Sequence, residues 1–343
     1  MKVLVAMSGG VDSSVTAALL QRQGHEVVGA TMKLWGGASD SGCCSLSDVE
    51  DARRVAQQLG IVHHVFNFGE EFLEHVVDPY VSAHAAGRTP NPCIECNRHV
   101  KFDRFIQRAR QLGFDAIATG HHARVTNDDG VFHLRRGDDP LKDQSYVLHM
   151  LDQDALSVTL LPVGEMNKAE VRRLAEEMGL RTAKKPDSQD VCFIMATGGR
   201  STFLGDRIPL RPGKLLDYTS GDEVGEVEAV ELVTVGQRKG MGGGTENRRY
   251  AIDIDVQNAV VRVGGTEDLM RDSVAIDDVT FTNEAIAPGT PVGVQVSAHG
   301  RPFDGIFNAD RIDFIEPQRR VAPGQSVVFY DGDVVLGGAL ATR

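Results

Sequence analysis

The residues best suited to chemistry lie near the start of the chain, where residues 8–14 read Ser-Gly-Gly-Val-Asp-Ser-Ser. Apolar runs lie on both sides of this segment, so the pattern predicts a buried strand, a glycine turn and a helix. Two glycines without Cβ atoms let backbone N–H groups approach an anion closely. The helix that begins near Val11 points its first N–H groups at the same place, and the serine hydroxyls add donors. Residues 8–14 are therefore a candidate phosphate site, in which Asp12 could hold a magnesium ion or cap the helix.

This loop differs from the two most familiar nucleotide-binding patterns. It lacks the lysine of G-x-x-x-x-G-K-[ST], so it is not a Walker loop, and it lacks the glycine spacing of the G-x-G-x-x-G dinucleotide fingerprint. A Ser-Gly-Gly-x-Asp-Ser sequence after a first strand instead resembles the pyrophosphate-binding loop of ATP pyrophosphatases, which split ATP between its α and β phosphates. The alternative is a serine-capped turn without a ligand, but the order of strand, turn and helix favours the phosphate site.

The five cysteines supply a second candidate chemistry. Cys93 and Cys96 form a Cys-x-x-Cys pair behind Thr-Pro-Asn-Pro at residues 89–92, and the prolines predict a rigid, extended loop rather than a helix. Cys192 lies in a second loop-like segment, and loop cysteines distant in sequence can meet over a nucleotide site. In a reducing compartment such cysteines indicate catalysis or metal binding. We interpret the adjacent cysteines at 43–44 as small buried residues, and a structural zinc ion would need one of them or a scattered histidine as its fourth ligand.

Two further polar segments could line the same site. Thr-Gly-His-His at residues 119–122 follows a predicted strand, and its histidines could act as bases or ligands, or simply line a nucleotide pocket. Lys142, Asp143 and Gln144 form a dense polar run. The lysine and the amide could contact phosphates or base edges, whereas the carboxylate could instead cap a helix.

Composition limits the class of protein. The formal net charge of −12 argues against broad, unspecific binding of nucleic acid, although one RNA could still bind through a local basic patch. No segment approaches 18 consecutive apolar residues, and no leader precedes the first predicted strand. We therefore expect a cytoplasmic protein without a membrane span.

The elements that must position these residues fall into three parts. Residues 1–197 alternate strand and helix patterns, which predicts an α/β domain built on a parallel sheet, with the polar segments at its carboxyl edge. Short β-type runs between glycine, proline and aspartate turns follow. They predict a small central β-rich linker domain over residues 198–265 and a terminal β-barrel over residues 266–343.

Taken in order, these motifs resemble the bacterial tRNA-specific 2-thiouridylases. The similarity runs from end to end. It rests on the segments at 8–14, 42–45, 89–97, 118–122, 142–146, 187–194 and 323–338. It implies an N-terminal ATP pyrophosphatase domain of the adenine nucleotide alpha hydrolase type, a small central domain and a C-terminal barrel.

The resemblance also implies ligands and partners. Sulfur would replace the 2-oxygen of the wobble uridine of tRNA, with ATP and Mg²⁺ as cofactors and a persulfide sulfur-donor protein or cysteine desulfurase as partner. Lys142, Asp143 and Gln144 would lie against the tRNA. The implied ATP site consists of Ala6, Met7, Ser8, Gly9, Gly10, Val11, Asp12 and Ser13, with Met32 and Gly120 beside the adenosine.

By the same resemblance, Cys192 carries the persulfide and Cys96 is its catalytic partner, either releasing sulfide or forming a Cys96–Cys192 disulfide. Cys93 stands where many members have aspartate, so an iron–sulfur cluster on Cys93, Cys96 and Cys192 is an alternative that this resemblance does not favour. Residues 296–301 also depart from the family pattern, and we assign no tRNA contact to the barrel.

Two other classes of function compete with this one. An amidating synthetase of the same superfamily would need ammonia and would leave the cysteines without a role. An RNA-binding module without activity would leave the loop at 8–14 without a role.

Overall fold

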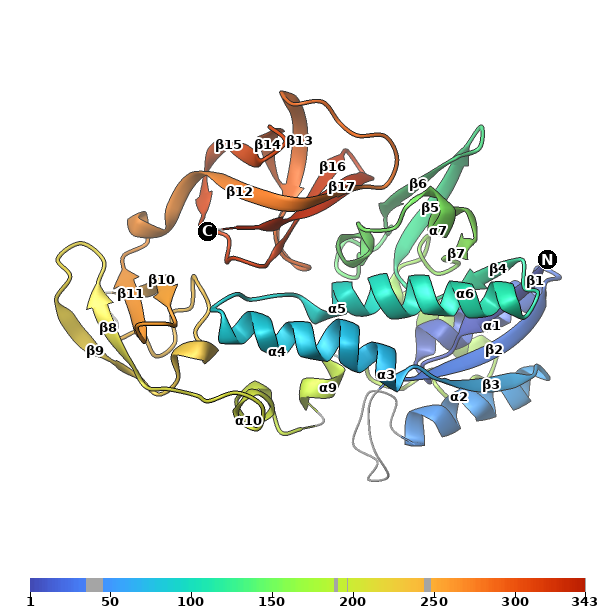
Figure 1. The fold of residues 1–343 in the computed structure, drawn as a ribbon. Coiled ribbons are helices and arrows are strands. Elements are labelled where there is room, and N and C mark those ends of the chain that lie inside the picture. Colours follow the sequence, from blue (N-terminus) through green and yellow to red (C-terminus); the bar gives the residue numbers. More distant parts are fainter. Residues whose placement is uncertain (35–45, 188–190, 196, 244–247, 343) are drawn as a thin grey trace.

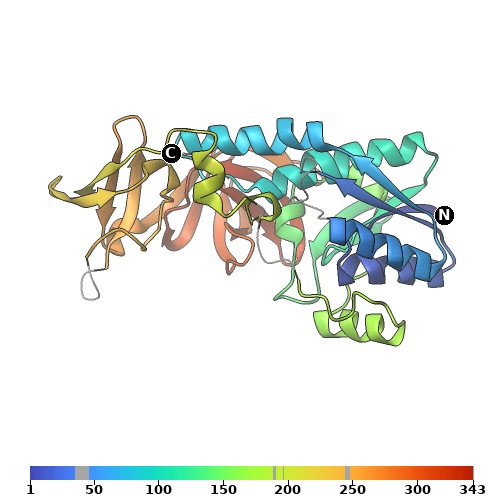
Figure 2. The same cartoon turned by 90° about the horizontal axis from the view of Figure 1, so that it is seen from below.

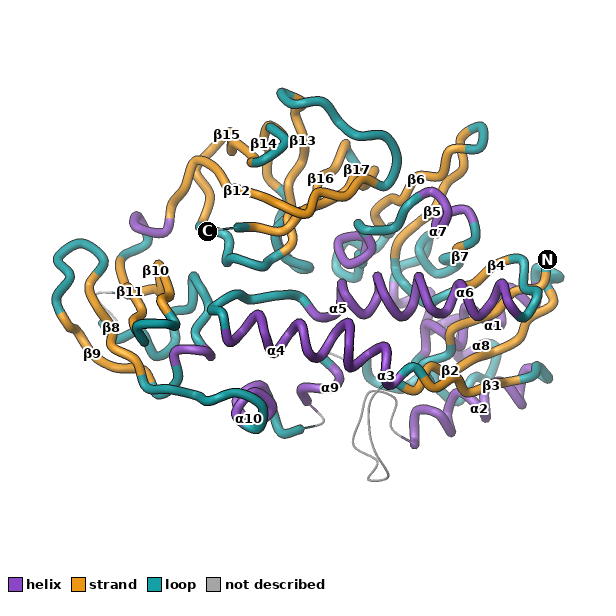
Figure 3. Tube along the Cα trace, viewed as in Figure 1, coloured by secondary structure: helices purple, strands orange, loops and turns teal. Residues whose placement is uncertain are grey.

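The computed structural model describes residues 1–34, 46–187, 191–195, 197–243 and 248–342. Figure 1 shows three regions: an α/β domain with the N-terminus, a small β-rich domain at the opposite end, and a barrel that lies against both. In the view from below, the α/β domain and the central domain occupy the two ends of an elongated molecule (Figure 2). Helices are concentrated in the first domain and strands in the other two (Figure 3). The predicted fold class, α/β with a central domain and a terminal barrel, is confirmed.

A parallel five-stranded sheet in the order β3-β2-β1-β4-β7 forms the centre of the first domain. β1 is fully apolar and buried along its last four residues, as expected for a strand covered on both faces. The strand order reverses between β1 and β4, and ligands of open parallel sheets bind at the carboxyl ends of the strands beside such a point. The strands are β1 (Lys2–Ala6), β2 (Glu26–Lys33), β3 (His63–Asn67), β4 (Ala116–Ala118) and β7 (Thr159–Leu160).

Helices pack on both faces of this sheet. Two long helical stretches, α3–η1–α4 and α5–η2–α6, contain π-type turns in their middle parts. The helices are α1 (Val11–Arg22), α2 (Leu46–Leu59), α3 (Gly69–Phe72), η1 (Leu73–Val77), α4 (Asp78–Ala85), α5 (Pro92–Glu95), η2 (Cys96–Arg104), α6 (Phe105–Gln111), η3 (Ser145–Leu148), α7 (Gln153–Ser157), α8 (Lys168–Glu177), α9 (Cys192–Met195) and α10 (Arg200–Gly205).

The central domain is a four-stranded sheet in the order β10-β11-β8-β9 around its own apolar core. Its elements are β8 (Gly213–Asp217), β9 (Glu223–Val227), η4 (Val230–Leu232), β10 (Tyr250–Asp255) and β11 (Val260–Gly264).

The last domain is a six-stranded antiparallel barrel, which closes because β12 pairs with both β15 and β17. Closure leaves no open edge among these six strands. Its elements are η5 (Glu267–Leu269), β12 (Met270–Phe281), β13 (Thr290–Gln295), β14 (Phe303–Phe307), β15 (Arg311–Arg319), β16 (Ser326–Asp331) and β17 (Val334–Ala341).

One hairpin of the first domain joins the barrel. β5 (Ala123–Asp128) and β6 (Val131–Arg136) pair with each other, and β6 pairs with β17 through Arg135 and Val334. Figure 1 shows the hairpin rising from the α/β domain beside β16 and β17. Apolar side chains from both domains share one buried cluster across this junction, so the barrel and the α/β domain have a common core.

The prediction of a non-helical cysteine loop was wrong. Cys93 lies inside α5 and Cys96 begins η2. Pro92 occupies the first turn of α5, where its missing N–H and fixed φ suit a helix start, and the side chain of Asn91 accepts a hydrogen bond from Cys93 N at 3.1 Å. Cys192, expected in a loop, begins the short helix α9.

Candidate active site

The loop after β1 has the shape that a phosphate ligand requires. Gly9 adopts φ +75°, and a Cβ there would lie 2.3 Å from the carbonyl oxygen of Asp48, so only glycine fits. Gly10 is the N-cap of α1, and no side chain caps this helix among the described residues. The first N–H groups of α1 therefore remain available to an anion. The predicted strand, glycine turn and helix from Val11 are confirmed.

Serine hydroxyls hold the loop in this shape. Ser13 Oγ accepts a hydrogen bond from Ser8 N at 3.2 Å and lies 3.3 Å from Ser8 Oγ. Ser14 Oγ donates to the carbonyl of Gly10 at 2.7 Å. The structure thus places Ser8, Gly9, Gly10, Val11, Asp12 and Ser13 around one turn, with Ala6 and Met7 in the strand end that leads into it.

The ends of β2 and β4 border this turn. A Cβ on Gly120 would lie 2.8 Å from the backbone nitrogen of Ser13, so glycine lets the end of β4 pack directly against the loop. Met32 lies near the carboxyl end of β2, next to the edge strand β3. Both residues predicted to border the nucleotide are therefore at the carboxyl edge of the sheet.

The carboxylate of Asp12 is the centre of an ion-pair network. Lys168 Nζ donates to both Asp12 oxygens at 2.7 Å, and His122 Nε2 lies 3.2 Å from Oδ1. Burial would raise the pKa of Asp12, but His122 and Lys168 outweigh it, so this pKa is lowered from its usual value. Asp12 is held as a carboxylate, the form that a cation requires.

Asp187 is the second carboxylate of this network. Lys168 and Arg172 contact its Oδ1 at 2.9 and 2.7 Å, and Lys142 Nζ donates to its Oδ2 at 2.8 Å. Burial opposes ionisation, but the hydrogen bonds and charges of Lys142 and Lys168 lower the pKa of Asp187 to about 2. Because Asp187 precedes Cys192 by five positions, the network links the phosphate loop to the segment that carries this cysteine.

Sequence reasoning did not predict a role for Lys168, Arg172 or Asp187. A local signal was available, because Asn167 and Glu170 form a capping box that places Lys168 at the first position of α8. A cation at the start of a helix opposes the helix dipole, so it needs a nearby carboxylate to offset that cost. The sequence could not show which carboxylates fill that role.

The three residues predicted to contact tRNA all bind other parts of this chain. Lys142 pairs with Asp187, and the side chain of Gln144 accepts a hydrogen bond from His122 N at 2.9 Å. Asp143 accepts from Gly137 N and Ser145 N at 3.0 Å, and Arg136 Nη1 donates to its other oxygen at 3.0 Å. Asp143 thus orders its own loop rather than capping a helix, and the tRNA contacts stay predictions.

The described cysteines lie in different environments. Cys93 and Cys192 are exposed, whereas Cys96 is 8 % exposed and belongs to the main apolar cluster. The protein atoms around the sulfur raise the pKa of the Cys93 thiol; the charge of Lys101 opposes this rise and that of Cys192 adds to it. Cys43, Cys44 and residues 188–190 lie outside the described residues.

A cleft of about 480 Å³ borders both sulfur-bearing helices. Asn91 and Pro92 line it at the start of α5, Val191 and Ile194 line it around α9, and Gln325 reaches it from the barrel. Tyr80 supplies an aromatic wall. The cleft has the size of a small-ligand site and lies where the domains meet.

The described residues contain no group of three histidine, cysteine or acidic side chains placed to hold a metal ion. In this arrangement Cys93, Cys96 and Cys192 therefore do not fit a cluster site. Within the same ranges, no helix is both long and apolar enough to cross a membrane.

Family models and relatives of known sequence all point to the same protein family. Models described as the HUP domain and the PRC-barrel domain of tRNA methyl transferase match residues 1–196 and 201–265, and a model described as an aminomethyltransferase beta-barrel domain matches residues 273–341. The chain is 45 % identical to the tRNA-specific 2-thiouridylase MnmA of Symbiobacterium thermophilum, across 100 % of this chain and 92 % of the relative. It is 43 % identical to the protein of the same name from a Roseiflexus species, across 100 % and 99 %.

Among solved structures, the U34-tRNA thiolase NcsA from Methanococcus maripaludis with its 4Fe-4S cluster is 18 % identical, with a TM-score of 0.38 over 60 % of this chain and 63 % of that chain. That likeness is too weak to carry the cluster over. The relatives at 43–45 % identity, by contrast, match from end to end and confirm the resemblance read from the motifs. The chain belongs to the tRNA-specific 2-thiouridylase family.

Proposed function

We propose that this protein replaces the 2-oxygen of the wobble uridine (position 34) of tRNA with sulfur and consumes ATP, releasing AMP and pyrophosphate. The observation that carries the proposal is an ion-pair link between the loop after β1 and the segment that leads to Cys192. Asp12 in the phosphate loop and Asp187 in the segment before Cys192 share the ammonium group of Lys168. Family membership supports tRNA as the substrate, because the relatives are named for it.

In the first step, the uridine 2-oxygen attacks the α-phosphorus of ATP and pyrophosphate leaves. The N–H groups at the start of α1 would bind the leaving pyrophosphate, and Met32 and Gly120 would border the adenosine. A carboxylate is the type of ligand that Mg²⁺ prefers, so Asp12 would hold the metal, which neutralises phosphate charge. Lys168 would then turn from Asp12 toward the phosphates.

In the second step, sulfur arrives as a persulfide on Cys192. Its terminal sulfur attacks carbon 2 of the adenylated uridine, and AMP leaves with the original oxygen. The thiolate of Cys96 then attacks the Cys192 sulfur; the S–S bond of the persulfide breaks, a Cys96–Cys192 disulfide forms, and the thiocarbonyl remains on the base. A dithiol reductant reopens the disulfide, and a persulfide-bearing protein or a cysteine desulfurase supplies the next sulfur.

The environments of Cys96 and Cys93 bear on which thiol attacks the Cys192 sulfur. Cys96 is buried in the main apolar cluster, so tRNA binding would have to expose its sulfur before it could attack. Cys93 is exposed, but the pKa of its thiol is raised, which disfavours a nucleophilic thiolate, so its proposed role is only auxiliary.

The cleft beside α5 and α9 is the proposed site of the flipped uridine. It is lined by Tyr80, Asn91 and Gln325, an aromatic ring and two amides that suit stacking on a pyrimidine and hydrogen bonding to its edge. Lys142 would exchange its bond with Asp187 for a tRNA phosphate, with Asp143 and Gln144 holding the surrounding loop.

The test is mass spectrometry of tRNA incubated with protein, ATP and a persulfide donor, using the Cys93→Ala, Cys96→Ala and Cys192→Ala variants. We expect 2-thiouridine with the wild type, none with the Cys96 or Cys192 variants, and substantial product with the Cys93 variant. A dead Cys93 variant together with iron bound after anaerobic purification would replace the persulfide route with cluster chemistry. Release of AMP without thiolated tRNA in the wild type would overturn the proposal.

A further inference from the structure

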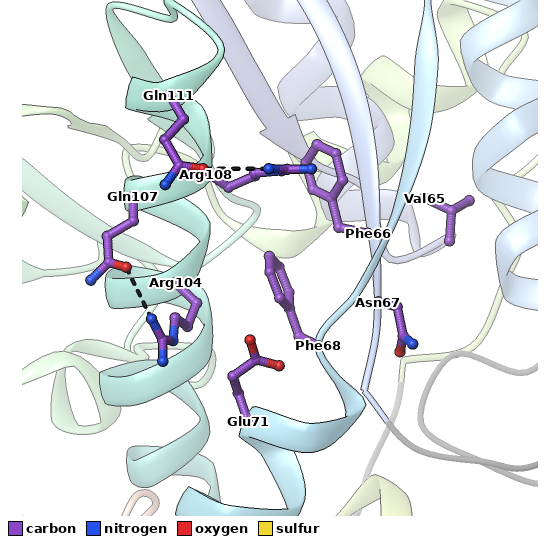
Figure 4. Close-up of a pocket in the computed structure, with 9 residues that line it drawn as sticks. All are labelled: Val65, Phe66, Asn67, Phe68, Glu71, Arg104, Gln107, Arg108 and Gln111. Carbon is purple, nitrogen blue, oxygen red and sulfur yellow. Dashed lines mark hydrogen bonds between the residues drawn. The ribbon is translucent and has the colours of Figure 1, made fainter.

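A groove outside the active site separates the edge strand β3 from the helical stretch η2–α6. Its volume is about 350 Å³, and it is lined by Phe66 of the strand and by Phe68 just after the strand. Figure 4 shows Arg104, Gln107, Arg108 and Gln111 along the opposite helical wall. Aromatic rings thus face a row of hydrogen-bond donors across a concave surface.

Two arginines give this groove a positive charge. Arg104 Nη1 donates to Gln107 Oε1 at 3.2 Å, and Arg108 Nη1 donates to Gln111 Oε1 at 3.4 Å. Neither guanidinium forms an ion pair with a carboxylate of the described residues, whereas Arg110 in the same helix pairs with Asp154 at 2.7 Å. Glu71, which also lines the groove, is not within ion-pairing distance of either arginine. Two such arginines are notable in a chain of net charge −12.

The strand beside these arginines has an open edge. Within the described part of the chain, β3 pairs with β2 alone. Two valines in or next to this strand are exposed, Val65 by 42 % and Val62 by 59 %. An unpaired edge displays N–H and C=O groups that can bind another extended chain.

The spacing of the two arginines along the helical wall matches the spacing of side chains on an extended peptide. Arg104 and Arg108 are four residues apart in a helical stretch, which separates them by about 6 Å along its axis. Alternate residues of a β-strand are about 6.6 Å apart and point to the same side. A strand with acidic residues at alternate positions could therefore offer one carboxylate to each guanidinium.

We infer that this groove docks an extended acidic segment of a protein partner, which adds a strand to the edge of β3. Its carboxylates bind Arg104 and Arg108, and its apolar side chains contact Phe66 and Phe68. The open strand edge favours a peptide over RNA, because main-chain groups pair with main-chain groups. The acidic remainder of the molecule would repel such a segment from other sites.

The test measures binding of a fluorescein-labelled octapeptide of alternating glutamate and valine to the full-length protein by anisotropy. We expect saturable binding that weakens with salt and falls at least tenfold in the Arg108→Glu variant. Arg173→Glu is the matched control, because Arg173 is also an exposed helical arginine and the charge change is the same. A peptide with glutamine in place of glutamate should bind at least tenfold more weakly than the acidic one.

Hydrogen exchange distinguishes strand addition from loose ion pairing. Bound peptide should protect the amides of residues 63–67 in the wild type but not in Arg108→Glu. Thiolation of tRNA with a small persulfide donor should be equal in both proteins, since Arg108 is not part of the proposed site. Equal peptide binding by wild type and Arg108→Glu, or no binding at millimolar peptide, overturns the inference. So does a pentauridylate probe that binds at least as well as the peptide and is lost in the same variant, since it would assign the groove to RNA.

Discussion

Among single residues, Asp12 has two roles. It accepts hydrogen bonds from Lys168, and it lies at the proposed phosphate site. We expect Asp12→Asn to slow AMP formation by about a hundredfold, because the charge that would neutralise metal and phosphate is lost. The fold should persist, since the side chain is partly exposed and contributes no apolar packing. Asp12→Glu, which keeps the charge, should retain more activity than Asp12→Asn. Wild-type rates of AMP release in Asp12→Asn would refute this assignment.

Asp187 makes the acid stability of the protein partly predictable. Its pKa is lowered to about 2, so its stabilising contribution is fully present above its unfolded pKa of about 4 and disappears as the pH falls toward 2. Asp187→Asn should therefore reduce the free energy of unfolding by about 2 kcal/mol at pH 7, and this difference should shrink below pH 4.

Urea unfolding at pH 7 and at pH 2.5 measures the difference in unfolding free energy between the wild type and Asp187→Asn. Asp154→Asn is the matched control: it also removes a carboxylate paired with arginine, but that pair is exposed and should be worth less than about 1 kcal/mol. A constant Asp187→Asn difference from pH 7 to pH 2.5 would contradict the proposed origin of the effect.

The sequence predicted the strand, glycine turn and helix correctly because the signals that specify them are local. Gly9, Gly10 and the start of α1 are adjacent in the chain, so their pattern specifies the turn. Lys168, in contrast, meets Asp12 across 156 positions, and no pattern around either residue encodes that meeting. The tertiary partners of a charged residue depend on packing that the sequence does not show.

At the scale of elements, the prolines before Cys93 were misread for a physical reason. Proline breaks a helix interior but is well suited to the first turn, and Pro92 occupies that turn beneath the cap of Asn91. Proline therefore favours a helix when it stands in the first turn and breaks a helix when it stands one turn later.

The contact of Gly120, two residues after β4, with the start of α1 gives a prediction at this scale. Gly120→Ala would place a Cβ 2.8 Å from Ser13 N, so the loop must shift. We expect affinity for a non-hydrolysable ATP analogue to fall at least tenfold, measured by titration calorimetry. Gly265→Ala is the control, since its Cβ would meet nothing closer than 3.8 Å, and its affinity should be unchanged. Wild-type affinity in Gly120→Ala would show that this edge does not bind the nucleotide.

For the whole molecule, Arg136 connects the α/β domain to the barrel. Its guanidinium lies 3.6 Å from the ring centroid of Tyr330, donates to Gln295 at 2.8 Å and holds Asp143. Arg136→Ala should release the loop around Asp143, increase proteolysis within residues 137–144 and weaken tRNA binding about tenfold or more. Affinity for ATP should not change, because Arg136 is not in the proposed ATP site.

Arg262→Ala is the control for this prediction, as Arg262 forms a partly exposed pair with Asp253 inside the central domain. Proteolysis and tRNA binding should be unaffected there. If Arg136→Ala binds tRNA like the wild type, the junction of domains does not position the tRNA loop.

The pairing of β6 with β17 also affects the order in which parts of the protein can fold during synthesis. Arg135 of the early hairpin binds Asp333 near the end of the chain, 198 residues later. At about 5–20 residues per second, a ribosome needs roughly 10–40 s to make the intervening chain. During that interval the parallel sheet can assemble, while the hairpin and the segment from Gly137 to Ser145 still lack their support. A nascent or truncated chain would therefore form the loop between β1 and α1 before the segment proposed to contact tRNA is ordered.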